Sequence, residues 1–147
     1  MALACDIRIA SEAARISMPF ARLGIAPSTA GSTYYLPRLI GIAKALELVF
    51  TGKTIDAREA KEIGLVNEVV PADELAKATY EMASTIAKFP PLSMRVSKRL
   101  LYQGMTTDMD PMLQQEAYAL NYLTQTEDHK EAVKAFAEKR EPVYKGR

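Results

Sequence analysis

Apolar and polar positions divide the chain into a first part with short apolar runs and a second part with long helical periods. The short runs are bounded by turn residues and are typical of buried strands, at residues 6–10, 14–18 and 65–70. Apolar positions three and four residues apart predict helices at residues 28–36, 41–50, 57–63, 72–89, 91–104, 110–126 and 128–140. We therefore expect a few short strands followed by an almost wholly helical second half.

Capping and breaking residues set the predicted ends of several helices. Residues 24–27, which begin with glycine and end with proline, predict an irregular turn. Ser28 or Thr29 is then expected to cap a helix that Pro37 stops. Asp56 is expected to cap a later helix, with Glu59 three residues on as in a capping box.

Several predicted helices carry apolar residues on more than one face. The helix at residues 41–50 has a stripe at Ile42, Leu46 and Val49. The helix at residues 110–126 has the stripe Leu113, Ala117 and Leu120 and, off it, Met112, Tyr118 and Tyr122. A fold of this size cannot readily bury both faces, so one interpretation is a partner surface, most simply a second copy of the chain. The other is that the aromatic rings lie at the rim with their polar ends in water.

Composition places the chain among ordinary globular proteins. It has 147 residues, of which 48% are hydrophobic and 25% charged, which suits one domain or less with a real core. The net charge of +1 gives no overall field that would favour nucleic acid. A single cysteine excludes an internal disulfide and suits a reducing cytoplasm, the expected location. No apolar run approaches the roughly 20 residues that cross a bilayer.

The chain begins with an apolar stretch rather than a polar, frayed one. Residues 1–10 have the character of a buried element that is already under way. We therefore expect Met1 to be an internal methionine, and the chain to be the C-terminal piece of a longer protein.

Residues 18–31 are the stretch whose composition most favours a binding site. They contain two glycines and two prolines, and no aspartate or glutamate occurs from residue 13 to residue 46. Gly24 permits backbone conformations barred to other residues. A helix start near Ser28 would present free N–H groups to a partial negative charge such as a thioester oxygen. The alternative, from the residues alone, is an ordinary strand-to-helix turn with capping hydroxyls.

Other reactive side chains are expected to be structural. His129, the single histidine, lies among charged residues and is expected on the surface. Cys5 lies in the first apolar run and is expected to be a buried thiol rather than a nucleophile. No spacing of His, Cys, Asp and Glu suggests a metal site. Lys139 and Arg140 are either favourable charges at a helix C-terminus or a site for phosphate.

Six motifs, in order along the chain, resemble those of the enoyl-CoA hydratase/isomerase, or crotonase, family. They are ALACDIRIA (2–10), PxxxLGIxP (19–27), LPRLIG (36–41), LVFTGKTIDAxEA (48–60), GLVNEVVP (64–71) and AFxEKRxP (135–142). The resemblance implies an α/β fold: a truncated crotonase-like ββα spiral with few short strands, followed by a mostly helical C-terminal oligomerisation region. Residues 1–71 would be the remnant of the spiral core, and residues 72–147 the C-terminal helical trimerisation region.

The resemblance also implies an activity. The family acts on acyl-CoA, for example in fatty acid metabolism, as a lyase or isomerase that stabilises a thioester enolate. No cofactor is expected, because the CoA thioester is the substrate. Self-association to a trimer or hexamer is expected, with no nucleic-acid or membrane partner.

Two glutamates carry the hydratase reaction in the family, and the resemblance places neither in this chain. The first falls just before the position matched by Met1, and the second matches Phe20. An aspartate used by some isomerases would fall at Ser28 or Thr29. Because hydration needs a base for the water and an acid for the α-carbon, we expect no ordinary hydratase activity. The alternatives are a non-catalytic paralogue that binds acyl-CoA or oligomerises, and a role in RNA binding.

The resemblance finally supplies the expected substrate contacts. The wall of the acyl-thioester site would be formed by Phe20, Leu23, Gly24, Pro27 and Ser28. Phe136 and Lys139 match an aromatic residue and a lysine that lie near the CoA in the family. No catalytic residue and no metal ligand is assigned.

Overall fold

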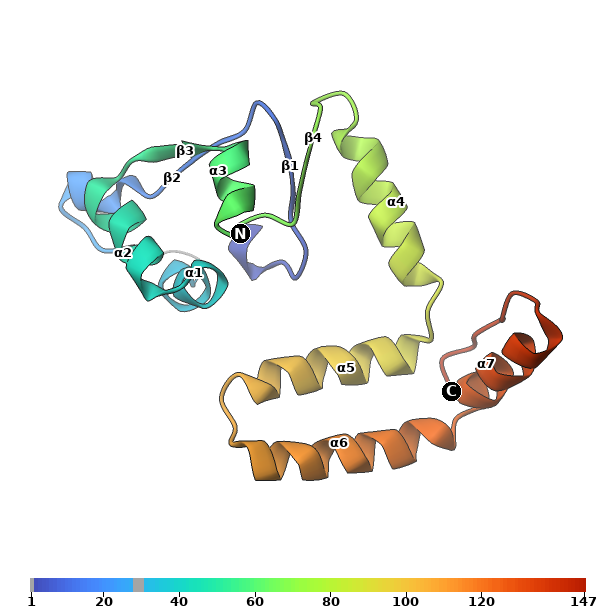
Figure 1. The fold of residues 1–147 in the computed structure, drawn as a ribbon. Helices are drawn as coiled ribbons and strands as arrows, with labels where there is room; N and C mark the ends of the chain where they lie inside the picture. The colour runs from blue at the N-terminus through green and yellow to red at the C-terminus, as the bar shows by residue number, and fades with distance from the viewer. Residues whose placement is uncertain (1, 28–30) are drawn as a thin grey trace. The chain divides into compact units, whose positions relative to one another are not determined.

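A computed structural model describes residues 2–27 and 31–147, which form two compact units, Met1–Glu81 (the first unit) and Met82–Arg147 (the second unit). All strands of the described residues lie in the first unit, and the second unit is helical (Figure 1). The boundary between the two units along the chain falls within helix α4 (Leu75–Ala87), whereas the sequence predicted a division after residue 71. The roles predicted for residues 1–71 and 72–147 stay predictions.

Two short two-stranded sheets lie in the first unit. Their strands are β1 (Ile9–Ser11), β2 (Arg15–Ser17), β3 (Thr54–Asp56) and β4 (Glu68–Val70). β1 pairs parallel with β4, and β2 pairs antiparallel with β3. The parallel pair requires a crossover connection, which the helices between β2 and β4 provide. The strands predicted at residues 14–18 and 65–70 are confirmed in shorter form, and β3 was not predicted.

The start of the chain differs from the predicted strand at residues 6–10. A 3-10 helix, η1 (Ala2–Ala4), and a bend precede β1, which begins only at Ile9. Cys5 lies in this bend and is exposed, so the prediction of a buried thiol is wrong. The reason is tertiary, because the paired register of β1 and β4 runs only from Ile9 to Ser11.

Three helices complete the core of the first unit: α1 (Ser32–Ile40), α2 (Ile42–Thr51) and α3 (Ala57–Glu62). The largest fully buried side chains in the described residues are Leu36, Leu48, Ile55 and Leu65. Burial of each contributes roughly 1.5–3 kcal/mol relative to an exposed position. The core therefore draws on α1, α2, β3 and the segment before β4.

Helix α1 continues through the proline that was expected to stop it. Pro37 lies inside the helix, and Gly31, with φ 71° and ψ 22°, precedes its first residue. Leu36 is buried just before the proline, and Leu39 and Ile40 pack partly buried against the same core just after it. Packing on both sides of Pro37 outweighs the lost helical hydrogen bond, so the predicted end was wrong.

The apolar stripe predicted for α2 lies only partly against the core. The extent of α2 agrees with the sequence, and Gly52 ends it in the left-handed conformation with φ 57°. Ala45 and Leu48 are buried and Val49 packs partly buried against the core, whereas Ile42 is 64% exposed and Leu46 is 41% exposed. Ile42 and Leu46 thus form an exposed apolar face, and the buried face combines the small Ala45 with Leu48.

The predicted cap of α3 is confirmed. The Asp56 carboxylate accepts a hydrogen bond from the Glu59 N–H at 2.8 Å. The reciprocal half of the predicted capping box is not found among the described contacts. The carboxylate of Glu59 lies against Lys44 and Lys53 instead.

The second unit contains α5 (Pro91–Gly104), α6 (Met109–Thr124) and α7 (Glu127–Glu138), close to the predicted bounds. Neither α4 nor α5 has a fully buried residue among those described. In α6, Met112 and Ala119 are buried, while Leu113 is 51% exposed and Leu120 is 66% exposed. The Leu113 and Leu120 stripe is therefore the exposed apolar face of α6, and the face that contains Met112 and Ala119 is buried, with α5 packed against the helix.

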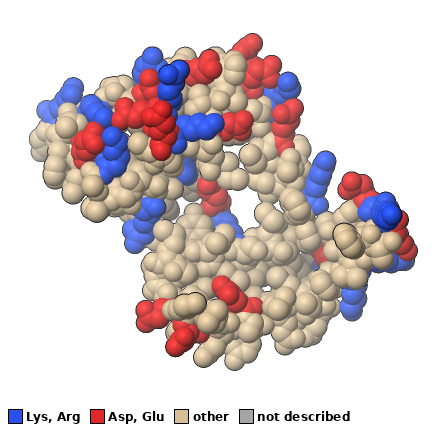
Figure 2. Space-filling model, viewed as in Figure 1, with Lys and Arg blue, Asp and Glu red and all other residues tan. Residues whose placement is uncertain are grey.

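Charged side chains are unevenly distributed over the chain. Figure 2 shows acidic and basic side chains close together over α2, β3 and α3, while the visible face of α5 is largely uncharged. Among the described residues, no helix combines the length and apolar character needed to cross a bilayer.

Candidate functional site

Residues 19–27, the described part of the predicted acyl site, form a short helical turn that we call the site loop. A 3-10 helix, η2 (Pro19–Leu23), begins with proline and ends at Gly24, whose φ is 69°. The N–H of Gly24 donates to the Ala21 carbonyl, and the N–H of Ile25 to the Phe20 carbonyl, both at 3.1 Å. The irregular turn predicted at residues 24–27 is confirmed, but η2 was missed. Proline at its first position and glycine just after its end are the signals that could have found it.

The predicted contact residues of the site loop lie in different surroundings. Phe20 is half-buried and packs against the core of the first unit. Leu23 is 69% exposed, and no described atom lies within 4 Å of the position that a Cβ would take at Gly24. The Pro27 carbonyl accepts from the buried Ser32 hydroxyl at 3.2 Å. The loop thus has an inward anchor, Phe20, and an accessible side at Leu23 and Gly24.

Two predicted residues of this stretch, Ser28 and Thr29, lie outside the described residues. Their predicted roles as caps and substrate contacts are therefore not tested. Helix α1 begins at Ser32, after Gly31.

A further residue of the site loop, Arg22, makes a contact that sequence reasoning missed. Its Nε and Nη2 donate to the carbonyl oxygen of Thr51, at 3.3 and 3.0 Å. The two residues are separated by 29 positions, and no local pattern links them. The contact joins the site loop to the C-terminal end of α2.

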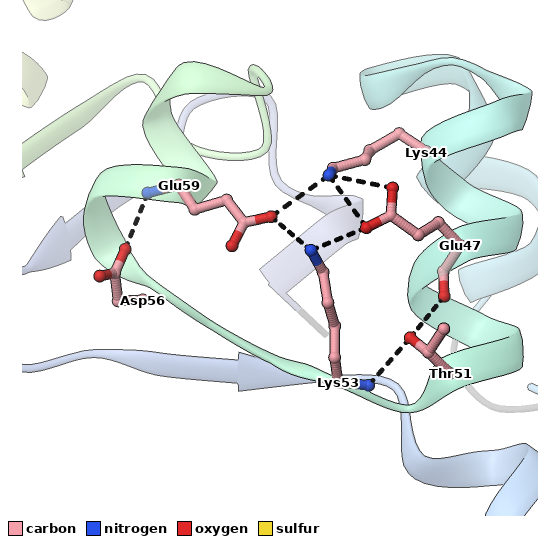
Figure 3. A network of polar contacts seen from close by, with 6 residues as sticks. All are labelled: Lys44, Glu47, Thr51, Lys53, Asp56 and Glu59. Atoms are coloured by element: carbon pink, nitrogen blue, oxygen red, sulfur yellow. Dashed lines mark hydrogen bonds and ion pairs between the residues drawn. The ribbon is translucent and has the colours of Figure 1, made fainter.

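Next to that end of α2, four side chains form an ion network (Figure 3). Lys53 Nζ lies 2.7 Å from Glu47 and 2.8 Å from Glu59. Lys44 Nζ lies 3.1 Å from Glu47 and 3.2 Å from Glu59. The hydrogen bonds from Lys53 are the main cause that lowers the pKa of both carboxyl groups, and those carboxylates raise the pKa of Lys53. The network ties α2 to α3 through the segment that contains Lys53.

The other two predicted contact residues, Phe136 and Lys139, lie in the second unit at the end of α7. Phe136 is 87% exposed. Lys139 ends α7 with φ 53° and is the one described non-glycine residue with positive φ. Its neighbour Arg140 is paired with Glu131 and Glu138, so its charge is already matched within the chain.

The described residues contain no cluster of side chains suited to bind a metal ion. No group of three or more His, Cys, Asp and Glu among them could hold a metal ion.

His129 is exposed, as predicted, and its backbone N–H donates to the Thr126 hydroxyl that caps α7.

Comparison with known proteins decides the family. A model of the enoyl-CoA hydratase/isomerase family matches residues 1–147. The chain belongs to the enoyl-CoA hydratase/isomerase family. It is 44% identical over 140 residues to the short-chain-enoyl-CoA hydratase of Clostridium acetobutylicum, covering 95% of the chain and 53% of that protein. It is 43% identical over 136 residues to the short-chain-enoyl-CoA hydratase of Clostridioides difficile, covering 92% of the chain and 87% of that protein.

A solved structure of a relative has the same fold as this chain. The crystal structure of an enoyl-CoA hydratase from Bacillus anthracis is 44% identical and superposes with a TM-score of 0.94, covering 99% of this chain. The predicted crotonase-like α/β fold, with few short strands and a mostly helical remainder, is therefore confirmed. The chain spans 56% of the Bacillus anthracis protein and 53% of the Clostridium acetobutylicum protein. It therefore corresponds to about half the length of each of these relatives.

Proposed function

We propose that this enoyl-CoA hydratase/isomerase family member acts on acyl-CoA thioesters and stabilises the thioester enolate, by chemistry other than ordinary hydration. The family match over residues 1–147 supports the substrate class, as do relatives named short-chain-enoyl-CoA hydratases. The claim that the chemistry is not ordinary hydration rests on Phe20, because the family resemblance places an acid at this position. No other aspartate or glutamate between residues 13 and 46 could replace that acid locally.

The chemistry follows from what a phenyl ring can do. Adding water across an enoyl thioester needs a base for the water and an acid for the α-carbon. The Phe20 side chain can neither donate nor accept a proton. By the same resemblance, residues 1–147 supply neither hydratase glutamate. Stabilisation of an enolate oxygen depends on hydrogen-bond donors rather than on an acid at this position, so it is compatible with Phe20.

The predicted contact residues have roles in this proposal. Phe20, Leu23, Gly24, Pro27 and Ser28 would form the wall around the acyl group. The exposure of Leu23 and the open space at Gly24 support a ligand on that side of the site loop. In the second unit, the exposed ring of Phe136 and the charge of Lys139 would contact the CoA. No cofactor beyond the CoA thioester is needed.

The proposal includes self-association of the chain to a trimer or hexamer. It also places the protein in the cytoplasm, without a nucleic-acid or membrane partner. Large apolar side chains on α5, at the residue that caps its C-terminus and on α6 support the self-association, because they are more than half exposed: Leu101, Met105, Met109, Leu113, Tyr118, Leu120 and Tyr122. Gel filtration of the purified chain is expected to give a mass above that of a monomer. A clean monomer of 16.2 kDa would contradict this part of the proposal.

Two thioesters test the proposed chemistry on the purified chain. Crotonyl-CoA is expected to bind without hydration, measured by the persistence of its enoyl absorbance. Acetoacetyl-CoA, whose enolate absorbs in the near ultraviolet, is expected to show saturable binding with an enolate signal, and free CoA serves as the control without an acyl group.

Each contrary result has a separate meaning. Measurable hydration of crotonyl-CoA would refute the argument from Phe20. Absence of saturable binding by either thioester would refute the acyl-CoA proposal as a whole. Saturable binding of acetoacetyl-CoA without an enolate signal would instead point to a non-catalytic acyl-CoA-binding paralogue.

A further inference from the structure

Arg22 connects the site loop to a part of α2 that needs a hydrogen-bond donor. Thr51 is the last residue of α2, and carbonyl groups in the last turn of a helix lack partners within the helix. The guanidinium supplies two donors to the Thr51 carbonyl, from Nε and Nη2. The partial negative charge at a helix C-terminus also favours a cation at this place.

The path of the Arg22 side chain depends on the glycine that follows Thr51. Gly52 is buried and has φ 57°, a conformation that other residues rarely adopt. A Cβ at Gly52 would lie 2.9 Å from Arg22 Nε and 3.3 Å from its Cδ and Cγ. The side chain therefore lies directly across the backbone of Gly52, along its carbon stem as well as at its charged end.

The receiving end of this contact is itself held in place. The Thr51 hydroxyl donates to the Glu47 carbonyl at 2.7 Å and accepts from the Lys53 N–H at 3.2 Å (Figure 3). Lys53 then joins Glu47 and Glu59 in the ion network. Thr51 is thus fixed to α2 on one side and, through Lys53, to α3 on the other.

We propose that Arg22 is a positioning residue for the acyl site, which holds residues 19–27 against the end of α2 and so fixes the place of Leu23 and Gly24. The inference deepens the proposed function and rests on it for the role of the loop as a wall of the site. Arg22 itself does not touch the substrate in this arrangement. Its side chain is turned to Thr51, while the accessible side of the loop is formed by Leu23 and Gly24.

Amide hydrogen exchange of the ligand-free chain tests the positioning role. In Arg22→Ala, exchange of residues 19–27 is expected to rise about tenfold, with α2 unchanged, since one modest hydrogen-bonded contact is lost. Arg15→Ala is the matched control, because Arg15 Nη1 donates only to the carbonyl of its neighbour Ala14 among the contacts described. Arg22→Lys, which keeps the charge and the stem but not the paired donors, is expected to give an intermediate rise.

Two exchange results would overturn the inference. Unchanged exchange of residues 19–27 in Arg22→Ala would show that the contact does not hold the loop. An equal rise in the site loop and α2 would show a general loss of stability rather than local positioning. Should Arg22→Ala not fold, Arg22→Lys decides the question by the same comparison.

Acetoacetyl-CoA titration then separates this inference from the proposed function. Affinity is expected to fall at least about threefold in Arg22→Ala and to stay at the wild-type value in Arg15→Ala. Faster exchange with unchanged affinity would overturn the role of Arg22 in the site, while leaving the proposed function intact. Absence of binding by the wild-type chain would refute the proposed function and with it this role, whatever the exchange result.

Discussion

The guanidinium of Arg140 and the carboxylate of Glu131 form a two-point ion pair, with Nη1–Oε1 and Nη2–Oε2 distances of 2.6 and 3.0 Å. The same Glu131 carboxylate accepts from the Val143 N–H at 3.0 Å. One turn earlier, the buried Asp128 accepts from the N–H groups of Lys145 and Gly146, at 2.7 and 2.8 Å. Two carboxylates of α7 thus hold the chain that follows the helix.

This ion pair predicts an acid-sensitive stability. The hydrogen bonds from Arg140, and then that from Val143, lower the pKa of Glu131 from 4.5 to about 2. The ionised carboxylate therefore stabilises the fold fully above pH 4.5, and its contribution is lost as the pH falls towards 2. We expect Glu131→Gln to lower the melting temperature at pH 7 and to flatten its fall between pH 4.5 and 2. Thermal unfolding at several pH values measures both effects.

The control for this prediction is Glu127→Gln. Glu127 has a single-point pair with Arg147, in which the two side chains are 59% and 67% exposed. Exposed pairs of this kind contribute little, so its melting temperature at pH 7 is expected to change less. An equal acid dependence in wild type and Glu131→Gln would contradict the assignment.

Replacement of Lys139 by glycine is predicted to increase the stability of the chain. Its φ of 53° is unfavourable for a residue with a Cβ. Lys139→Gly is therefore expected to stabilise the chain by roughly 0.5–1 kcal/mol in urea unfolding. Lys134→Gly, in the interior of α7, is expected to destabilise it by about 1 kcal/mol. Destabilisation by both variants would show that the Lys139 side chain makes a compensating contact.

Gly52→Ala is predicted to destabilise the first unit. The positive φ accounts for roughly 1–2 kcal/mol, and the flexible Arg22 side chain has to move away from the new Cβ as well. Gly104 is the matched control, because it lies in α5 and the nearest atom to a Cβ there is Met112 Cε at 3.9 Å. Gly104→Ala is expected to stabilise the chain by about 0.5–1 kcal/mol. Urea unfolding measures both, and equal effects would contradict the role of backbone conformation.

Truncation of Phe20 is predicted to lower stability, whereas truncation of Phe136 is predicted to leave it almost unchanged. Phe20→Ala removes a ring that packs against the core and is expected to lose roughly 1–3 kcal/mol of stability. Phe136→Ala removes a ring that is 87% exposed and is expected to stay within about 0.5 kcal/mol. If Phe136 contacts CoA as proposed, its variant weakens acetoacetyl-CoA binding at unchanged stability. Unchanged affinity would remove Phe136 from the proposed site.

Local signals in the sequence predicted local features of the fold. Asp56 caps α3 because its carboxylate reaches an N–H only three residues away. Gly52 ends α2 because glycine tolerates a positive φ. Pro90 and Pro91 separate α4 from α5 for similarly local reasons. Such features need no information about distant parts of the chain.

Features that depend on packing were predicted less well. Pro37 lies inside α1 because the residues on both sides of it reach a common core. Glu59 contacts two lysines rather than its own cap, since those lysines lie close to it only in the folded unit. In the site loop, the predicted contact of Phe20 with an acyl group stays a prediction, and what the structure shows is that its ring packs against the core.

Six ordered motifs were enough to identify the family without any coordinates, and the lack of an acid near Phe20 is likewise a matter of residue identity. By contrast, the buried helix faces and the hydrogen-bond acceptor of the Arg22 guanidinium became known only from the folded chain. Burial depends on what packs against a helix, and Ala45 gives no sign of it beside the larger Leu46. A contact across 29 residues likewise exists only when the fold brings both ends together.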